Sequence, residues 1–255
     1  MFWMLLHADD APGIWLYRRL RQQGVVVELV TVDEWFCNQV FTLTMDETTA
    51  DTYLRLQDGR VWNLEQTRAV MARVRSMPTV AWQLFAQSEK DYVAQEWQAI
   101  FMAWADLMPM LFNQPTPMGM SGRNRSTGEW SQLADSVGFD TIPFFYDSAV
   151  GIVAQTDLHH AQRFDLLVYR GRCYGNPVLL SASVEEMACA LQVASGEQLL
   201  GVSLSMSAAG FVFMGASTHP DLRLGGDGFV DAILTDLYDG TALRSSERLA
   251  PAIAC

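Results

Sequence analysis

Four arginines form the most evident candidate binding site in this sequence. Arg73 and Arg75 alternate along an apolar segment, and Arg123 and Arg125 lie in a loop rich in Pro, Gly, Ser and Asn. A guanidinium group binds a carboxylate or a phosphate through two parallel hydrogen bonds. The sequence therefore predicts a site for an anion or a peptide at these arginines, and a solvated loop is the alternative for the second pair.

A second candidate site contains histidines and aspartates. His7, Asp9 and Asp10 come directly after the first apolar segment, and His219 lies in a late turn. Open α/β sheets bind their ligands at the carboxyl ends of the strands, which is where the first three residues are expected. Histidine and aspartate are common general acids and bases. Capping of the following helix explains the two aspartates equally well.

Motifs for a nucleophile, a phosphate-binding loop or a metal are missing. Gly201-Val-Ser203-Leu-Ser205 departs from the serine-hydrolase motif G-x-S-x-G at its last position. The sequence has neither a Walker A motif nor G-x-G-x-x-G, and its histidines lack metal-ligand spacing. The cysteines are scattered without a C-x-x-C pair and are expected to be incidental thiols: Cys37, Cys173, Cys189 and Cys255. We therefore predict no catalytic residue, metal or cofactor from motifs.

The composition is that of a folded protein with an acidic surface. The 255 residues are 50% apolar and 18% charged, which excludes intrinsic disorder. Seventeen Lys and Arg against 29 Asp and Glu give a net charge of −12, which disfavours nucleic acids and anionic membranes as partners. No apolar run reaches the ~20 residues of a transmembrane helix, and the first residues lack the basic start of a signal peptide. A cytoplasmic protein is expected.

The first third of the chain has the pattern of a β–α–β unit. Phe2–Leu6 and Val25–Val32 are apolar strand segments, and the residues between them have helical spacing from Pro12 to Gly24. Continuous apolar strands are typical of a parallel sheet that is covered on both faces. Val70–Val74 is a further expected strand. We therefore predict an N-terminal α/β domain with a parallel sheet.

The rest of the chain predicts a mixture of helices and hairpins. The expected elements are 52–56 with 60–62, 88–108, 130–137, 164–169 with 172–175, 183–194, 199–206 with 211–216, and 229–238. Ser88 with Asp91, and Ser183 with Glu186, have the spacing of helix-capping boxes. Because the second half is α+β, we expect domains at 1–143 and 144–240 and a tail at 241–255.

A series of short motifs runs through most of the chain. They are Glu96-Trp97, Asn113-Gln-Pro115, Trp130 to Ala134, Gly138 to Pro143, Phe164 to Cys173, Leu200 to Ser203 and Phe211 to Ser217. Their order resembles that of ATP-grasp peptide ligases of the microviridin type, and the opening β–α–β unit with Arg73-x-Arg75 resembles the domain that precedes the ATP-grasp core there. The resemblance implies a pre-ATP-grasp-like domain with a parallel sheet, followed by a reduced ATP-grasp-like core with an antiparallel sheet and helices.

Positions that bind nucleotide and metal in that family carry other residues here. Glu129 stands in place of a lysine, and Leu167 stands in place of an arginine. The positions of an aspartate, a glutamate and an asparagine are occupied by Ser203, Gly215 and Ser217, respectively. Neutral short side chains cannot replace carboxylates that hold Mg²⁺ against phosphates. Only about 20 residues separate Pro143 from Asp165, where the family inserts a nucleotide-clamping subdomain.

The resemblance and these departures predict a degenerate, truncated ATP-grasp-like protein without ligase activity or cofactor. We expect it to bind a peptide, or a protein partner, in a pathway that modifies ribosomal peptides or makes natural products. Trp62, Trp82 and Trp130 are expected to be exposed anchors of that interface, and the resemblance implies that two copies can pair. The alternatives are an ATP-independent enzyme that uses the histidine and aspartate site, and a structural subunit of a complex.

Overall fold

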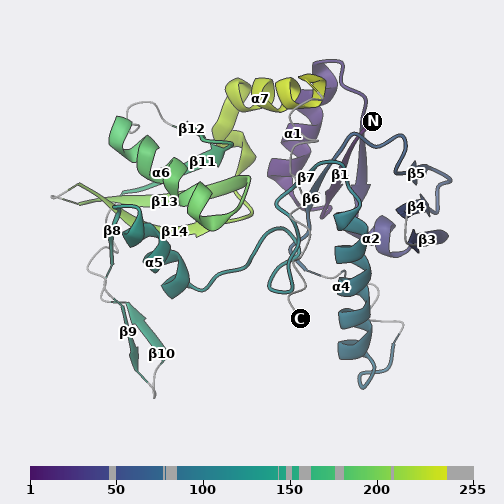
Figure 1. Cartoon of the computed structure of the whole chain (residues 1–255), viewed down its shortest axis with the longest axis horizontal. Coiled ribbons are helices and arrows are strands. Elements are labelled where there is room, and N and C mark those ends of the chain that lie inside the picture. Colours follow the sequence, from purple (N-terminus) through teal and green to yellow (C-terminus); the bar gives the residue numbers. More distant parts are fainter. Residues whose placement is uncertain are drawn as a thin grey trace, which may run out of the picture.

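The computed structural model has two lobes with a helix between them (Figure 1). It describes residues 1–45, 50–76, 78, 85–142, 144–147, 151–154, 162–175, 181–207 and 210–239. The first lobe contains a parallel sheet and a small antiparallel sheet, and the second contains a five-stranded sheet and a separate hairpin. The predicted α/β class with a mixed second half is confirmed. Trp82 and the expected tail at 241–255 lie outside the described residues.

A four-stranded parallel sheet forms the centre of the first lobe, in the order β2-β1-β6-β7. Its strands are β1 (Phe2–Leu6), β2 (Val27–Thr31), β6 (Ala69–Arg73) and β7 (Leu111–Phe112). Every residue of β1 and β6 is buried, because alternate residues pack into separate apolar cores on the two faces of the sheet. The predicted parallel β–α–β unit is confirmed.

Helix α1 (Ala11–Gln22) connects β1 to β2 and begins where the acidic pair and the proline predict. Asp10 is its N-cap and accepts a hydrogen bond from the Gly13 N–H. The helix ends before Gly24, whose φ of 79° is the left-handed conformation expected after a helix. Helix α2 (Val32–Phe36) follows β2 directly and is not predicted by the apolar pattern.

Helix α4 (Lys90–Asp106) covers the sheet face opposite to α1. Its N-cap is Glu89, whose carboxylate accepts a hydrogen bond from the Ala86 N–H one turn earlier. The predicted cap by Ser88 is therefore wrong, since the chain enters the helix through a turn in which this serine has no capping role.

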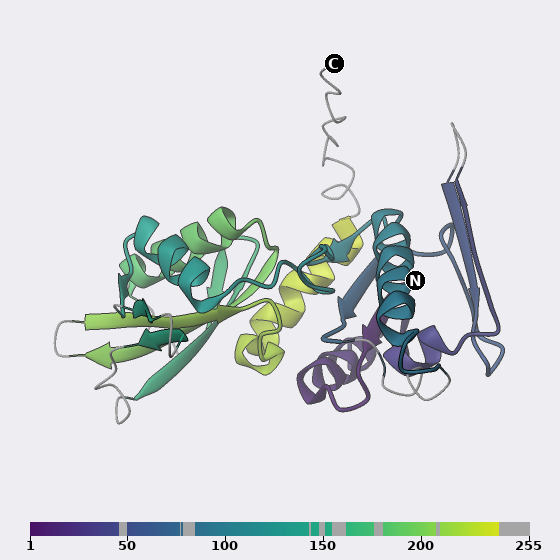
Figure 2. The ribbon, with the colours of Figure 1, turned by 90° about the horizontal axis from the view of Figure 1, so that it is seen from below.

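A three-stranded antiparallel sheet lies beyond α2 and α4 (Figure 2). It consists of β3 (Val40–Met45), β4 (Ala50–Arg55) and β5 (Val61–Asn63). The predicted hairpin between β4 and β5 is confirmed. Trp62 is 2% exposed and packs edge-on to Trp3 in the core, so the expectation that Trp62 is exposed is wrong. Its ring fills the space between the small sheet and the parallel sheet.

The second lobe is a five-stranded sheet with two helices on one face (Figure 2). The strand order is β12-β11-β13-β14-β8, from β12 (Arg172–Tyr174), β11 (Arg163–Tyr169), β13 (Leu199–Ser207), β14 (Gly210–Ser217) and β8 (Asp140–Thr141). Helices α5 (Thr127–Ser136) and α6 (Ala182–Ser195) pack on it over one apolar core. The separate hairpin is β9 (Phe144–Asp147) with β10 (Gly151–Ala154). The predicted β11–β12 and β13–β14 hairpins are confirmed.

Two local expectations for this lobe are wrong. Helix α6 is capped by Ser181, which accepts a hydrogen bond from the Val184 N–H, and not by the predicted pair Ser183 and Glu186. Trp130 is 5% exposed, because it lies on the face of α5 that packs on the sheet. Trp130 therefore belongs to the core of the second lobe.

One of the apolar cores contains residues of both lobes. Helix α7 (Gly226–Asp239), preceded by the short 3-10 helix Leu222–Gly225, packs against α1, and its Phe229 contacts Tyr169 of β11. Phe112 of β7 stacks on the same tyrosine. The expected boundary at residue 143 stays a prediction, although α5 and β8 precede it in sequence and pack with the second lobe.

No helix in the described part of the chain combines the length and apolar composition needed to cross a membrane.

Candidate functional site

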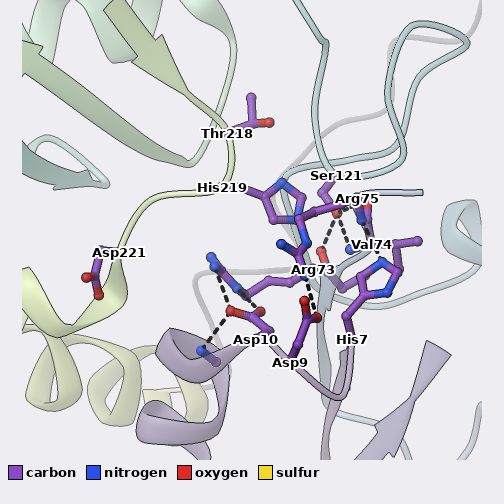
Figure 3. Close-up of polar contacts among 12 residues, drawn as sticks. His7, Asp9, Asp10, Arg73, Val74, Arg75, Ser121, Thr218, His219 and Asp221 are labelled. Atoms are coloured by element: carbon purple, nitrogen blue, oxygen red, sulfur yellow. Dashed lines mark hydrogen bonds and ion pairs between the residues drawn. The ribbon is translucent and has the colours of Figure 1, made fainter.

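Asp10 and Arg73 form a buried ion pair at the carboxyl end of the parallel sheet (Figure 3). Nε of Arg73 donates to Oδ2 of Asp10 at 2.6 Å, and Nη2 donates to Oδ1 at 3.1 Å. Burial raises the pKa of Asp10, but the hydrogen bonds and charge of Arg73, with the Gly13 N–H, bring it below its ordinary value. The pair joins the two candidate sites of the sequence, since each residue comes from a different one.

Arg75 contacts His7 and Asp9, which lie in the loop between β1 and α1. Its backbone N–H donates to Nε2 of His7 at 3.1 Å, and its guanidinium pairs with Asp9. Burial, followed by the charge of Arg75, lowers the pKa of His7. His7 is therefore neutral at pH 7, and the ring nitrogen that a base would use already accepts a hydrogen bond.

His219 approaches this cluster from the second lobe, in the connection from β14 to α7 (Figure 3). Burial, with the positive charges of Arg73 and Arg75, lowers the pKa of His219 to about 4. Among the described residues, Nε2 of His219 and Nη1 of Arg73 are buried without a hydrogen-bond partner. Buried polar atoms without partners are costly.

Ser121 fastens the long loop between β7 and α5 to the end of β6. Its hydroxyl accepts the Val74 N–H at 2.7 Å and donates to the Ala72 carbonyl at 2.8 Å. The serine is buried, and its hydroxyl bonds to backbone groups at the end of β6 as a neighbouring strand would. The sequence carries no motif for this role, because the bonded residues are more than forty positions apart.

The two loop arginines have different surroundings. The side chain of Arg125 is 9% exposed; it donates to the Ser195 carbonyl at 2.6 Å, pairs with Glu197 and lies 4.9 Å from the Trp130 ring. Arg123 donates its backbone N–H to Glu197 at 2.8 Å, whereas its side chain is 51% exposed. Burial raises the pKa of Glu197, and the Arg123 N–H and Arg125 oppose this rise. Arg125 and Glu197 hold the loop in place, and Arg123 stays accessible.

A cavity of about 400 Å³ lies between the lobes and brings the predicted residues together. Its lining includes Arg75, Arg123, Arg125, Ser217 and His219. The volume is that of a small-molecule or side-chain pocket. The remaining candidates are connected to the cavity through Arg75. They are Arg73, His7, Asp9 and Asp10, which bond to one another or to Arg75. The structure thus joins both predicted sites into one.

A second group of residues lies in a row across the sheet of the second lobe. Asp165 of β11 is paired with Ser203 of β13, and Ser203 is paired with Gly215 of β14. Ser203 and Gly215 are positions that the resemblance assigns to metal binding, and the register of the sheet places them side by side with Asp165. The Ser203 hydroxyl donates to Oδ1 of Asp165, and the Arg163 guanidinium contacts both residues.

The comparisons with known proteins identify the fold. No protein-family model matches the sequence, and no curated protein is similar to it in sequence. Macrocyclase MdnC from Microcystis aeruginosa MRC, solved with precursor peptide MdnA, matches with a TM-score of 0.67 and 10% identity over 94% of this chain and 99% of that chain. Macrocyclase MdnB from the same organism matches with a TM-score of 0.64 and 12% identity over 93% and 99%.

A third solved structure is a RiPP-associated ATP-grasp ligase from Chryseobacterium gregarium in complex with ADP and a leader and core peptide. It matches with a TM-score of 0.61 and 11% identity, over 95% of this chain and 96% of that chain. The chain therefore has the ATP-grasp fold, as its motifs predict.

ATP with Mg²⁺ is the ligand pair that this fold implies, and the row in the second lobe does not fit it. Mg²⁺ is bound by one or two carboxylates together with the phosphates, and the one carboxylate of the row, on Asp165, accepts from Ser203 and pairs with the positively charged Arg163. Glu129, at the position of the expected lysine, accepts the Ser126 N–H as part of the α5 cap. Within the described ranges, no three His, Cys, Asp or Glu residues are grouped to hold a metal ion.

Proposed function

We propose that this chain is a non-catalytic, ATP-grasp-like protein that binds a peptide in a peptide-modifying pathway. The observation that carries the proposal is the row Asp165, Ser203 and Gly215, in which the single carboxylate is already bonded to Ser203 and Arg163. The positive charge of Arg163 at this place disfavours a divalent cation. The fold supports the link to peptide modification, because structures of the same fold are macrocyclases and ligases solved with peptides.

The cavity between the lobes is the proposed peptide site. Arg75 and Arg123 line it with side chains that are 50% and 51% exposed. Their present partners, Asp9 and Glu129, are also exposed, and such surface ion pairs contribute little free energy. A carboxylate from a peptide can therefore replace either partner at small cost. His219, whose lowered pKa keeps its ring neutral at pH 7, lines the same cavity.

Arg73 and Arg125 have a different part in this proposal. Both side chains are at least nine-tenths buried and bonded within the protein. Arg73 holds the loop that carries Asp9, and Arg125 holds the loop that carries Arg123. We therefore assign contact with the peptide to Arg75 and Arg123, and positioning to Arg73 and Arg125.

The test is calorimetric titration of the purified protein, first with ATP and Mg²⁺ and then with a synthetic glutamate-rich peptide. We expect no heat from the nucleotide and saturable binding of the peptide. The same peptide with glutamine in place of glutamate is expected to bind at least tenfold more weakly, because it lacks the charge for the arginines. Nucleotide binding at micromolar affinity would return ligase activity to consideration.

A double variant tests the assignment of residues. Arg75→Ala with Arg123→Ala removes both exposed guanidinium groups of the cavity, and we expect peptide affinity to fall by more than tenfold. The matched control is Arg18→Ala with Arg21→Ala, which removes the same charge from exposed positions on α1. Equal affinities of the two double variants would remove the cavity from the proposal.

A further inference from the structure

Two of the four cysteines lie in contact in the second lobe, although nothing in the sequence pairs them. Cys173 is the central residue of β12, and Cys189 lies on α6. Their sulfur atoms are 3.6 Å apart, and Cys173 also donates to the Glu185 carbonyl oxygen at 3.7 Å. Two adjacent thiols can form a covalent bond that scattered thiols cannot.

The surroundings permit that bond. Both thiols are partly exposed and pack against the apolar core under α6. A disulfide is about 2.05 Å long, so the sulfur atoms must approach by about 1.6 Å. Because β12 is the edge strand of its sheet, it is hydrogen-bonded to one neighbouring strand, β11. Closing the bond requires rotation of the side chains about their Cα–Cβ bonds.

We propose that Cys173 and Cys189 are a redox modification site, at which a small peroxide forms an intramolecular disulfide. One thiol reacts with hydrogen peroxide to give a sulfenic acid and water. The second thiol then attacks the sulfenic sulfur and releases a second water. Two thiols and one hydrogen peroxide thus give one disulfide and two waters, with the peroxide as the oxidant.

The chemistry of the two steps differs in rate. Burial and the neighbouring Cys189 raise the pKa of Cys173, so little thiolate is present and its reaction with peroxide is slow at neutral pH. The second step is intramolecular between atoms already in contact, and it is fast. A sulfenic acid formed here therefore closes to the disulfide before a second peroxide oxidises it further.

The disulfide fastens the edge strand β12 to α6. It closes the chain between residues 173 and 189, which restricts the unfolded state and stabilises the folded one. For a loop and a protein of this size we expect the melting temperature to rise by roughly 5–10 °C. The site is distinct from the cavity between the lobes and does not depend on the proposed function.

Peptide mapping of the full protein reads the bond directly. Trypsin leaves both cysteines in one peptide, because no Lys or Arg lies between Cys173 and Arg223. A Glu-specific protease then cleaves after Glu185 and Glu186, between the two cysteines. After peroxide treatment and alkylation of free thiols, we expect the two fragments to stay joined and to separate on reduction.

Variants supply the controls. Cys37→Ser leaves the proposed pair intact and is expected to keep the joined fragments, whereas Cys189→Ser abolishes them. If both cysteines are alkylated after peroxide treatment, or are oxidised separately without joined fragments, the proposal is wrong. The wild-type digest decides this without any variant, so a folding defect of Cys189→Ser does not affect the outcome.

Discussion

The side chain of Asn113 holds the backbone of Leu199 through both atoms of its amide. Oδ1 accepts the Leu199 N–H at 2.9 Å, and Nδ2 donates to the Leu199 carbonyl at 2.6 Å. The same amide accepts the Gln198 N–H and donates to the Thr218 carbonyl. Asn113 follows β7 of the first lobe, and its partners belong to the second, so this one buried side chain joins the lobes beside the cavity.

Replacement of Asn113 should therefore remove hydrogen bonds between the lobes and lower the free energy of unfolding. Asn113→Ala removes four hydrogen bonds and places alanine at a φ of 53°, and we expect a loss of about 3–4 kcal/mol in the free energy of unfolding. Asn113→Gly removes the same bonds but accepts that φ, so it should cost about 1 kcal/mol less. Urea unfolding measures both. Equal stability of the alanine variant and wild type would contradict the role.

The buried pair of Asp10 and Arg73 gives a second prediction. Arg73→Met leaves a buried carboxylate without its partner, and we expect a loss of about 3–5 kcal/mol. Asp10→Asn in the same chain removes that charge while asparagine still caps α1, so the double variant should regain about half of the loss. Chemical denaturation of the wild type, both single variants and the double variant completes the cycle. A double variant as unstable as the sum of the single variants would show that the two side chains do not interact.

Local features of this chain could be predicted from the sequence, but the ion pairs could not. The apolar run of β1 and the acidic start of α1 are local signals, and the sequence predicts both elements correctly. Arg73 and Asp10 are 63 residues apart, and their contact depends on the parallel register that places Arg73 beside Leu6. The sequence therefore identified the charged residues but assigned them to two sites that the structure joins.

The errors at helix starts and at tryptophans have related causes. Ser181 and Ser183 are both possible caps, and their hydroxyls are 3.1 Å apart. In the folded chain the hydroxyl of Ser181 accepts the Val184 N–H and caps the helix. Trp62 and Trp130 lie in short amphipathic segments whose buried face depends on which element packs on them. No local pattern carries that information. The contact between Cys173 and Cys189 could not be predicted for the same reason, because β12 and α6 meet only in the folded protein.

Gly122 provides a prediction about the loop that carries Arg123. Its φ is 90°, and a Cβ atom would lie 2.5 Å from Oε2 of Glu197. Gly122→Ala should therefore displace the carboxylate that accepts the Arg123 N–H, and we expect a loss of about 2–3 kcal/mol together with weaker peptide binding. The matched control is Gly59→Ala, which has a similar φ of 85° and nothing near its Cβ position, so it should cost only about 1 kcal/mol. Equal losses, measured by urea unfolding, would mean that the contact with Glu197 is unimportant.

The buried ring of His219 predicts how stability depends on pH. Burial and the charges of Arg73 and Arg75 lower its pKa to about 4 from an ordinary value of 6.5. The unfolded chain therefore binds a proton at a higher pH than the folded protein does. The stabilising contribution is complete above pH 6.5 and is lost as the pH falls from there to about 4, and this shift corresponds to roughly 3 kcal/mol.

His219→Gln removes this titration and keeps a polar side chain in the cavity. We expect urea midpoints of the wild type to fall between pH 7 and pH 4, and the midpoint of the variant to fall less over the same range. His7 titrates in the same sense, since its pKa is also lowered, so His7→Gln is the necessary comparison. NMR titration of the ring protons assigns each curve to a residue. If the ring of His219 titrates near pH 6.5, the cavity is wetter than its burial indicates, and the proposed neutral wall of the peptide site must be abandoned.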